Sequence, residues 1–375
     1  MKKFVRKICF FSIFLNLVLY SHGQKPVIQK QPVPGPSKIT IIKFDPSGAI
    51  DFPFDSLVKS VNAIELQTPA GLNASTLLNL ARTDSFFVAY VGYSYRIFDL
   101  TGKFLKDVGS TGDGANSLRS LFGHFADNKS ILSVYQNKWI KYALDGSIIQ
   151  RGVIPYQMHP NSLMPLSDSI WLFYTPHLGP DDTSRLWSTD LNFNIKKRYL
   201  HSDKHSPTGG MGFMKYIYPT SNGIYITDRV VDTIYRFTEK AVDPVYVFDS
   251  GSYKYYRTFE MRRLSEDEIT TEFKLVSANA VLFKVLTRDR SYFIYHNRIT
   301  KITKTIKTIT NGPDLINSWI LKGFDNKDRL FWRLVEGSDT LINAASKKVG
   351  YTSLLERRKV PFSKANPIII ITTLK

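Results

Sequence analysis

The chain has 375 residues, a formal net charge of +18 and 43% hydrophobic residues, which allows one large domain or two smaller ones. Cys9 is the only cysteine, and it follows charged residues instead of the apolar and small residues that precede a lipidated cysteine. These features argue against a lipoprotein and against a disulfide-stapled secreted scaffold.

Residues 1–23 have the parts of a secretory signal peptide. Four cations lie at the N-terminus, and an apolar run follows from Ile8 to Tyr20. Small residues at Ser21 and Gly23 predict cleavage before Gln24. The apolar run is shorter than the roughly 20 residues that span a bilayer, so a retained membrane anchor is the less favoured alternative. We therefore expect a periplasmic or extracellular protein with no transmembrane segment after the signal is removed.

The mature chain stays basic, because the signal peptide holds four cations and no Asp or Glu, and its loss lowers the charge from +18 to +14. Export argues against nucleic acid as a partner and leaves anionic envelope surfaces. The alternative is that scattered Lys and Arg keep a β-rich protein soluble and protect its strand edges. Residues 24–37 include four prolines and predict an extended linker before a single domain at 38–375.

A repeat organises the rest of the chain. Polar turns lead into apolar strands whose first apolar residues lie at 86, 131, 170, 224, 281 and 330, in steps of 45, 39, 54, 57 and 49 residues. Each has a second strand after it: Tyr95–Leu100, Trp139–Leu144, Arg185–Leu191, Thr233–Phe237, Tyr292–Tyr295 and Thr340–Ala344. A propeller blade takes about 40 to 50 residues. The repeat predicts an all-β fold, a six-bladed β-propeller of four-stranded antiparallel blades.

Two strand-like segments lie outside the six hairpins, at Lys38–Phe44 and Ile368–Thr372. We expect them to meet in one blade, so that N- and C-terminal strands close the ring; the alternative is that the isoleucines form an ordinary edge strand. Leu264–Phe273 is the best helix candidate, because Ser265 followed by Glu268 resembles a capping box.

The segment from Tyr95 to Gly109, with the sequence YRIFDLTGKFLKDVG, resembles the blades of NHL-type propellers. More closely, the chain resembles a family of exported bacterial six-bladed β-propellers of NHL/TolB-like type, over roughly residues 39 to 345. The resemblance implies the propeller fold and a signal peptide. It implies no reaction, since members are largely uncharacterised and propellers host both binding and catalysis.

Few residue patterns indicate chemistry. Gly109, Gly112 and Gly114 lack phosphate-loop spacing and predict a tight turn. His201, Asp203 and His205 form the only metal-like cluster, which we interpret as a solvated loop because no further ligands can be identified. Six aromatic residues could stack on sugars, although packing between blades is the favoured interpretation: Tyr90, Tyr93, Tyr95, Trp171, Tyr174 and Trp187.

No catalytic, metal, cofactor or ligand-binding residue can be assigned from these patterns, and no cofactor is expected. We predict a non-enzymatic propeller that binds a protein or glycan partner through its axial funnel or a loop face. The alternative is a propeller enzyme, a lactone hydrolase or a lyase, with a metal or polar cluster on the axis, for which Asp228 and Asn279 are candidates. A third possibility is binding to an anionic surface that weakens with salt.

Overall fold

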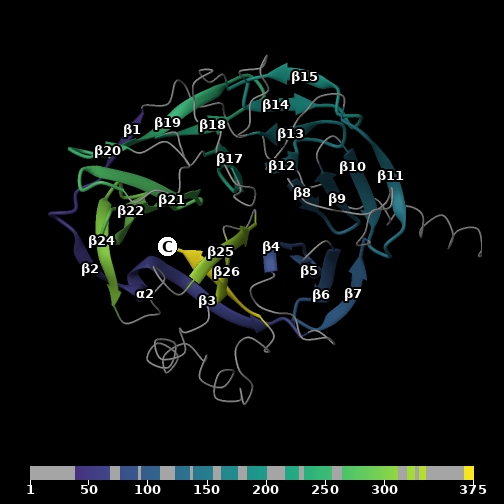
Figure 1. The fold of residues 1–375 in the computed structure, drawn as a ribbon, viewed down its shortest axis with the longest axis horizontal. Helices are drawn as coiled ribbons and strands as arrows, with labels where there is room; N and C mark the ends of the chain where they lie inside the picture. Colours follow the sequence, from purple (N-terminus) through teal and green to yellow (C-terminus); the bar gives the residue numbers. More distant parts are fainter. Residues whose placement is uncertain are drawn as a thin grey trace, which may run out of the picture. The chain divides into compact units, whose positions relative to one another are not determined.

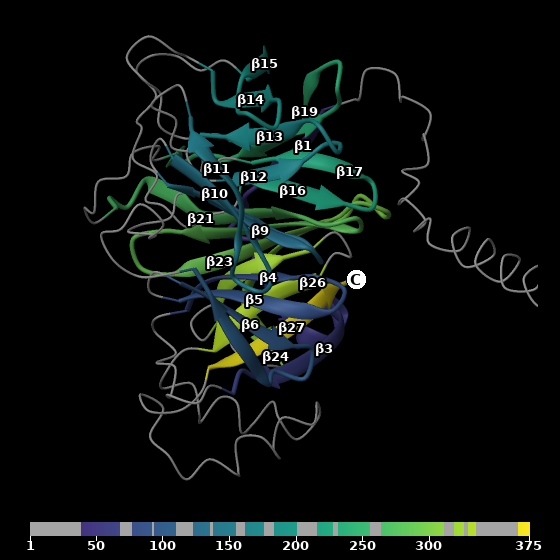
Figure 2. The ribbon, with the colours of Figure 1, turned by 90° about the vertical axis from the view of Figure 1, so that its right-hand side faces the viewer.

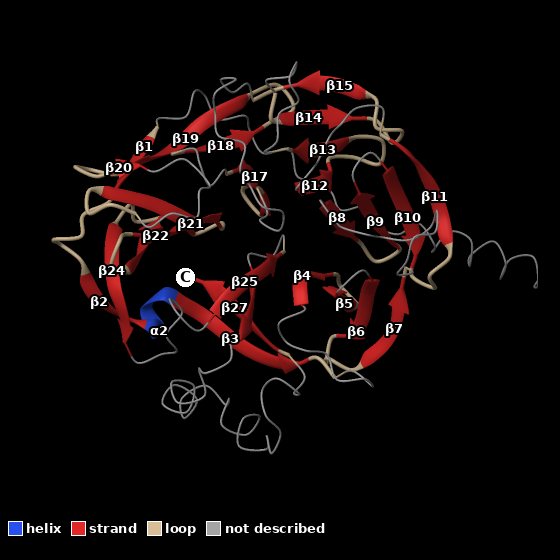
Figure 3. Cartoon of the chain, in the orientation of Figure 1, coloured by secondary structure: helices blue, strands red, loops and turns tan. Residues whose placement is uncertain are grey.

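The computed structural model describes residues 39–67, 77–91, 94–109, 123–135, 138–154, 162–175, 184–200, 216–227, 232–255, 264–310, 319–325, 329–334 and 367–375. All of these lie within one unit, Lys38–Lys375. Strands dominate it (Figure 3), and the one helix among the described residues is α2 (Phe54–Leu57). No helix in this part of the chain is long and apolar enough to cross a membrane.

The described strands form six sheets, which we number in chain order. Sheet 1 is β4 (Leu77–Arg82), β5 (Phe86–Val91), β6 (Ser94–Asp99) and β7 (Phe104–Val108). Sheet 2 is β8 (Gly123–Ala126), β9 (Ser130–Tyr135), β10 (Lys138–Ala143) and β11 (Ile148–Val153). Sheet 3 is β12 (Ser162–Pro165), β13 (Trp171–Tyr174), β14 (Leu186–Thr189) and β15 (Ile195–Arg198). In each, neighbouring strands run antiparallel.

The other three sheets take strands from both ends of this unit. Sheet 4 is β16 (Ile217–Thr220), β17 (Gly223–Ile226), β18 (Thr233–Phe237) and β19 (Val242–Asp249), with β1 (Thr40–Lys43) added. Sheet 5 is β21 (Glu268–Val276), β22 (Ala280–Leu286), β23 (Ser291–Asn297) and β24 (Thr303–Thr310), with β2 (Ile50–Pro53) and β20 (Lys254–Tyr255) added. Sheet 6 is β25 (Trp319–Phe324), β26 (Arg329–Leu334), β27 (Ile368–Leu374) and β3 (Val58–Glu65).

Each sheet therefore contains four antiparallel strands. The first strands of successive sheets contact one another, from β25 to β4, β8, β12, β16 and β21. Figure 1 looks down on these first strands near the centre, and Figure 2 shows the sheets from the side. Antiparallel four-stranded blades packed in this way are the architecture of a β-propeller.

Apolar side chains fill the space between neighbouring sheets, and every one of the six residues of β5 is buried. Phe87 of β5 packs toward Ile369 of sheet 6, whereas Tyr90 of the same strand packs toward Tyr142 of sheet 2. Further clusters join sheets 2 and 3, sheets 3 and 4, and sheets 4, 5 and 6. A strand covered on both faces needs a continuous apolar run, which is why the repeat stood out in the sequence.

The six predicted repeat starts are confirmed, because β5, β9, β13, β17, β22 and β26 each begin within one residue of the predicted position. The predicted partner strands of the first five are also present, as β6, β10, β14, β18 and β23. The sixth was wrong. Thr340–Ala344 lies outside the described residues, and the neighbours of β26 are β25 and β27.

The predicted helix at Leu264–Phe273 was also wrong, since residues from Glu268 onward form β21. The capping contact is present: the backbone N–H of Ser265 donates to Glu268 Oε2 at 2.9 Å. However, Ile269 and Thr271 are fully buried at alternate positions, and β-branched residues with period-two burial favour a strand. The capping box therefore forms a turn and leads into a strand.

The N-terminal belt, residues 40–65, runs along three sheets in succession. β1 pairs with β19 and β2 with β24, both in parallel, and β3 pairs with β27 in antiparallel. Lys38–Phe44 therefore does not share a sheet with Ile368–Thr372, and this part of the closure prediction was wrong. The eight-residue strand β3 pairs with β27 along its length, from Ile368 to Leu374. β1 has only four residues, so it could not pair with the whole of β27.

The belt is anchored by buried apolar side chains. Ile42, Phe44, Phe52, Phe54 and Leu57 are each at most 6% exposed and belong to the cluster that joins sheets 4, 5 and 6. Because these side chains bury apolar area that the sheets would otherwise expose, the belt is part of the core.

A tight joint connects the end of the belt to sheet 1. The backbone N–H of Gln67 donates to the carbonyl of Gly102 at 2.8 Å, and the N–H of Phe104 donates back to Gln67 at 3.1 Å. Gly102 has a φ of +93°, and a Cβ there would lie 2.1 Å from the carbonyl oxygen of Glu65. Both the backbone conformation and the close approach therefore require glycine.

We expect Gly102→Ala to destabilise the protein more than Gly146→Ala. Gly146 has a similar φ of +98°, but a Cβ there would meet nothing within 4 Å. The strain of a positive φ costs about 1–2 kcal/mol at either site, and the forced shift at Gly102 adds about 1–3 kcal/mol. Urea unfolding of the two variants measures the difference, and equal losses would show that the close approach of Gly102 to the Glu65 carbonyl does not matter for stability.

A second pair of variants tests the belt. Phe44→Ala removes a side chain that is 2% exposed and should cost about 3–5 kcal/mol. Ile41 lies in β1, three residues before Phe44, and its side chain is 66% exposed. Ile41→Ala should therefore cost less than about 1 kcal/mol. Unfolding midpoints compare them, and a small effect of Phe44→Ala would show that the belt is peripheral.

Candidate functional site

The turns between the first and second strands of the six sheets, which we call the inner turns, share one hydrogen-bonding pattern. In each, a side-chain oxygen at the start of the turn accepts a backbone N–H further along. The pairs are Thr83 with Phe86 (3.1 Å), Asp127 with Ser130 (2.7 Å), Ser167 with Ser169 (3.3 Å), Thr220 with Asn222 (3.1 Å), Ser277 with Ala280 (3.0 Å) and Asp325 with Arg329 (3.1 Å). Short oxygen-bearing side chains favour such turns.

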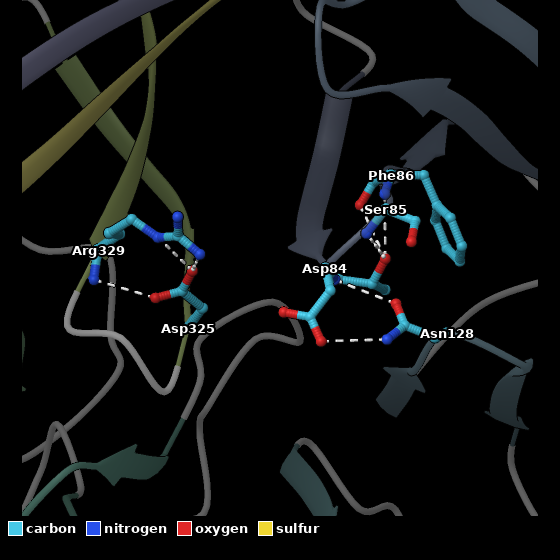
Figure 4. Close-up of polar contacts among 7 residues, drawn as sticks. Asp84, Ser85, Phe86, Asn128, Asp325 and Arg329 are labelled. Carbon is cyan, nitrogen blue, oxygen red and sulfur yellow. Dashed lines mark hydrogen bonds and ion pairs between the residues drawn. The ribbon is translucent and has the colours of Figure 1, made fainter. Parts of the chain in front are cut away.

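The inner turns lie close together on one side of the sheets, because they end first strands that contact one another. Hydrogen bonds also cross between them. The Asp84 N–H donates to Asn128 Oδ1 at 3.0 Å, and Asn128 Nδ2 donates to Asp84 Oδ2 at 3.1 Å (Figure 4). Asn222 Nδ2 donates to the Ala278 carbonyl at 3.1 Å, from sheet 4 to sheet 5.

Five of the inner turns present an Asp or Asn side chain at the surface. Asp84, Asn128, Asp168 and Asn222 are exposed and Asn279 is half-buried. The large apolar residues that are exposed in the described part of the chain lie elsewhere, on or just before outer strands or on the turns between third and fourth strands: Ile39, Ile41, Ile50, Leu105, Ile149, Val153, Leu191, Ile299 and Ile302. The inner turns thus form a polar surface, which we call the Asx surface.

A pair of arginines lies at the junction of sheets 6 and 1, beside the Asx surface. Arg329 donates from Nε to Asp325 Oδ2 at 2.7 Å, and its Nη2 lies 2.5 Å from the same oxygen (Figure 4). The Asp325 side chain is 7% exposed and that of Arg329 is 23% exposed. A nearly buried carboxylate therefore fixes one guanidinium in place while part of it reaches solvent.

Arg82, at the end of β4, has fewer polar partners for its guanidinium than Arg329 has. Its guanidinium lies 5.4 Å from the centre of the Phe87 ring, and its Nε is buried with no hydrogen-bond partner among the described residues. Burial lowers the pKa of Arg82, and the charge of Arg329 lowers it further, whereas Asp325 and Asp84 raise it. The positive charge is thus held where it is poorly stabilised.

A second polar cluster links sheets 4 and 5 at the outer side of the same face. Arg298 donates from Nε to the Tyr246 hydroxyl at 2.9 Å and from Nη1 to the Ser277 carbonyl at 2.5 Å, and from Nη2 to the Tyr225 hydroxyl. Its guanidinium also lies 4.6 Å from the centre of the Tyr225 ring. Since these contacts satisfy the guanidinium with groups from both sheets, the cluster is a structural link.

The structure brings together few of the residues that the sequence singled out. Gly109 has a φ of +84°, as a tight turn requires, while Gly112 and Gly114 lie outside the described residues, as do Asp228 and the cluster from His201 to His205. Asn279 is in an inner turn, where its carbonyl accepts the Arg298 N–H at 2.7 Å. Among the described residues, no three His, Cys, Asp or Glu side chains are grouped to hold a metal.

Core packing is confirmed for the aromatic residues that are described, since Tyr90, Tyr95, Trp171, Tyr174 and Trp187 are at most 8% exposed; Tyr93 lies outside the described residues. Sequence reasoning missed Arg82, Asp325 and Arg329. The one signal that could have indicated the site is the Ser, Thr or Asp that begins each turn before the second strand.

The family described as a domain of unknown function, DUF4934, matches residues 41–373, and the chain belongs to that family. The crystal structure of BF0058 from Bacteroides fragilis, described as a proposed exported protein, has a TM-score of 0.70 and 16% identity, covering 90% of this chain and 100% of that one. A catalytically inactive virginiamycin B lyase from Staphylococcus aureus has a TM-score of 0.44 and 11% identity, covering 84% and 99%. No curated protein matches the sequence.

A pH effect on stability is expected from His296, which is 1% exposed and lies next to the Arg298 cluster. Burial lowers its pKa below the ordinary 6.5, with Lys301 and Arg298 lowering it further. The unfolded chain therefore takes up a proton at a higher pH than the folded protein does, and stability falls as the pH drops below about 6.5.

The test compares His296→Gln with the wild type by urea unfolding at pH 7.5 and pH 5.5. Gln keeps a polar group beside Thr303 Oγ1, which lies 2.9 Å from His296 Nδ1, but it cannot titrate. The loss of stability between the two pH values should be smaller in the variant. An equal loss would assign the pH effect to other groups.

Proposed function

We propose that this member of the DUF4934 family is an exported, six-bladed β-propeller that binds a glycan partner through the Asx surface and does not act as an enzyme. The six sheets, the apolar clusters between neighbours and the repetition of one turn pattern in all six support the blade count. In this proposal β3 and β27 close the ring, with the rest of the belt reinforcing it.

Export is supported by the charged and apolar segments of residues 1–23, and by the likeness in fold to BF0058. Cleavage before Gln24 would leave the proline-rich residues 24–37 as a linker to the propeller at 38–375. Cys9 would be lost with the signal peptide, so the mature protein would carry no lipid. The site of action would be the periplasm or the cell exterior.

The observation that carries the binding proposal is the polarity of the Asx surface. Protein interfaces are usually centred on exposed aromatic or aliphatic side chains, and no large apolar side chain among the described residues is exposed in the inner turns. Carboxylate and amide groups instead match hydroxyl groups, since they offer both acceptors and donors. This combination favours a glycan over a protein partner.

Binding of the mature chain, Gln24 to Lys375, to a panel of neutral and acidic oligosaccharides tests the proposal. Asn128→Ala should weaken binding about three- to tenfold, because it removes one hydrogen-bonding side chain. Asn192→Ala makes the same change in an exposed turn between β14 and β15 and should leave affinity unchanged.

Equal effects of the two variants, or binding to a protein partner alone, would contradict the glycan proposal. Turnover of a lactone, glycoside or peptide panel that a single mutation in the inner turns abolishes would replace it with the enzymatic alternative. Calorimetry and product analysis on the same preparations distinguish these results.

A further inference from the structure

The junction of sheets 6 and 1 holds two arginines from neighbouring sheets. Arg82 ends β4, which contacts β25 of sheet 6, and the charge of Arg329 is close enough to lower the pKa of Arg82. The carboxylates beside them already accept hydrogen bonds. Asp325 accepts from Arg329 with both oxygens, Oδ1 from the backbone N–H and Oδ2 from the guanidinium, and Asp84 Oδ2 accepts a hydrogen bond from Asn128. The site therefore holds two guanidinium groups and two carboxylates beside a polar surface that can contact hydroxyl groups.

Both guanidinium groups have donors to spare. The contacts of Arg329 with the described residues use Nε and Nη2, so its Nη1 amino group is not engaged by them. Arg82 Nε is buried with no acceptor among the described residues, whereas the side chain as a whole is only half-buried. Its amino groups can therefore gain charge-assisted hydrogen bonds when an anionic oxygen arrives.

We propose that Arg82 and Arg329 form a subsite for the carboxylate of an acidic glycan, with the Asx surface contacting the neighbouring hydroxyl groups. A planar carboxylate matches the fork of a guanidinium better than a point charge does. It would also lie between the two arginine charges and accept hydrogen bonds from the amino groups of the Arg82 guanidinium. This inference rests on the proposed function, because it names the class of glycan.

Protein surfaces rich in acidic residues could offer the same carboxylate. The glycan is favoured because the exposed side chains of the inner turns that follow β4 and β8 include Asp84, Ser85 and Asn128. An acidic peptide would lack the hydroxyl groups that these side chains can bind. Poly-glutamate is therefore an informative competitor.

The probes are tetragalacturonate and its fully methyl-esterified form, which share the sugar ring and differ in charge. We expect the mature protein to bind the acid at least about tenfold more tightly than the ester, and Arg82→Gln to remove most of that preference. Lys103→Gln, which removes one charge from an exposed outer turn, should keep it. Titration calorimetry at 50 and 500 mM NaCl measures the affinities.

The outcomes separate the two proposals. Equal affinity for acid and ester would overturn the carboxylate subsite while leaving glycan binding intact, and binding of neither would count against the proposed function itself. Equal losses in Arg82→Gln and Lys103→Gln, or poly-glutamate binding as well as the acid does, would replace the subsite with general charge attraction.

A folding readout accompanies the binding data. Because Arg82→Gln removes a poorly stabilised charge, its unfolding midpoint should equal or exceed that of the wild type. If Arg82→Gln unfolds, Arg82→Lys is measured in its place. Lys keeps the charge but lacks the planar fork, so Arg82→Lys should reduce the preference for the acid about as strongly as Arg82→Gln would. Retention of the full preference by Arg82→Lys would overturn the subsite.

Discussion

The fold depends on one constraint: each four-stranded sheet has two apolar faces, and neither can be left to water. β5 shows it most clearly, since all six of its residues are buried, with Phe87 packed toward sheet 6 and Tyr90 toward sheet 2. Sheets with two apolar faces can be covered by packing one beside the next. The N-terminal belt meets the same constraint at sheets 4, 5 and 6, where Phe44 and Leu57 are buried in their shared core.

The end of the belt lies in close backbone contact with a turn of sheet 1. From β3 the chain passes next to the Asp99–Lys103 turn of sheet 1, where Asp99 accepts hydrogen bonds from the N–H groups of Thr101 and Lys103. That turn brings Gly102 against the Glu65 carbonyl. The sequence DLTGK, which carried the resemblance to NHL-type blades, therefore has a physical role here: the aspartate shapes the turn and the glycine admits a neighbouring backbone.

The repeat could be predicted from sequence because it reflects local patterns of apolar strands and polar turns. Pairing over long distances could not. β3 was missed as the partner of β27, since periodicity assigns no partners, and Ser265 with Glu268 predicted a helix that Ile269 and Thr271, both buried in sheet 5, exclude. Most of the fold was thus accessible from sequence. For the candidate site, the polar residues of the turns could be recognised in the sequence. The pairing of Arg82 with Arg329 could not, because it depends on the contact between sheets 6 and 1.

Two arginines of this face, Arg298 and Arg82, differ in how many of their donors are hydrogen-bonded. Arg298 binds two tyrosine hydroxyls and a carbonyl across sheets 4 and 5, and each inner turn has its own side-chain acceptor. Arg82 departs from this rule with a buried Nε that no described residue accepts. Folding alone would favour its replacement by a neutral side chain, since an unpartnered buried donor lowers stability. An anionic ligand that binds the amino groups of the same guanidinium would offset part of that cost, which is why we propose the subsite at Arg82 and not at the better-bonded Arg298.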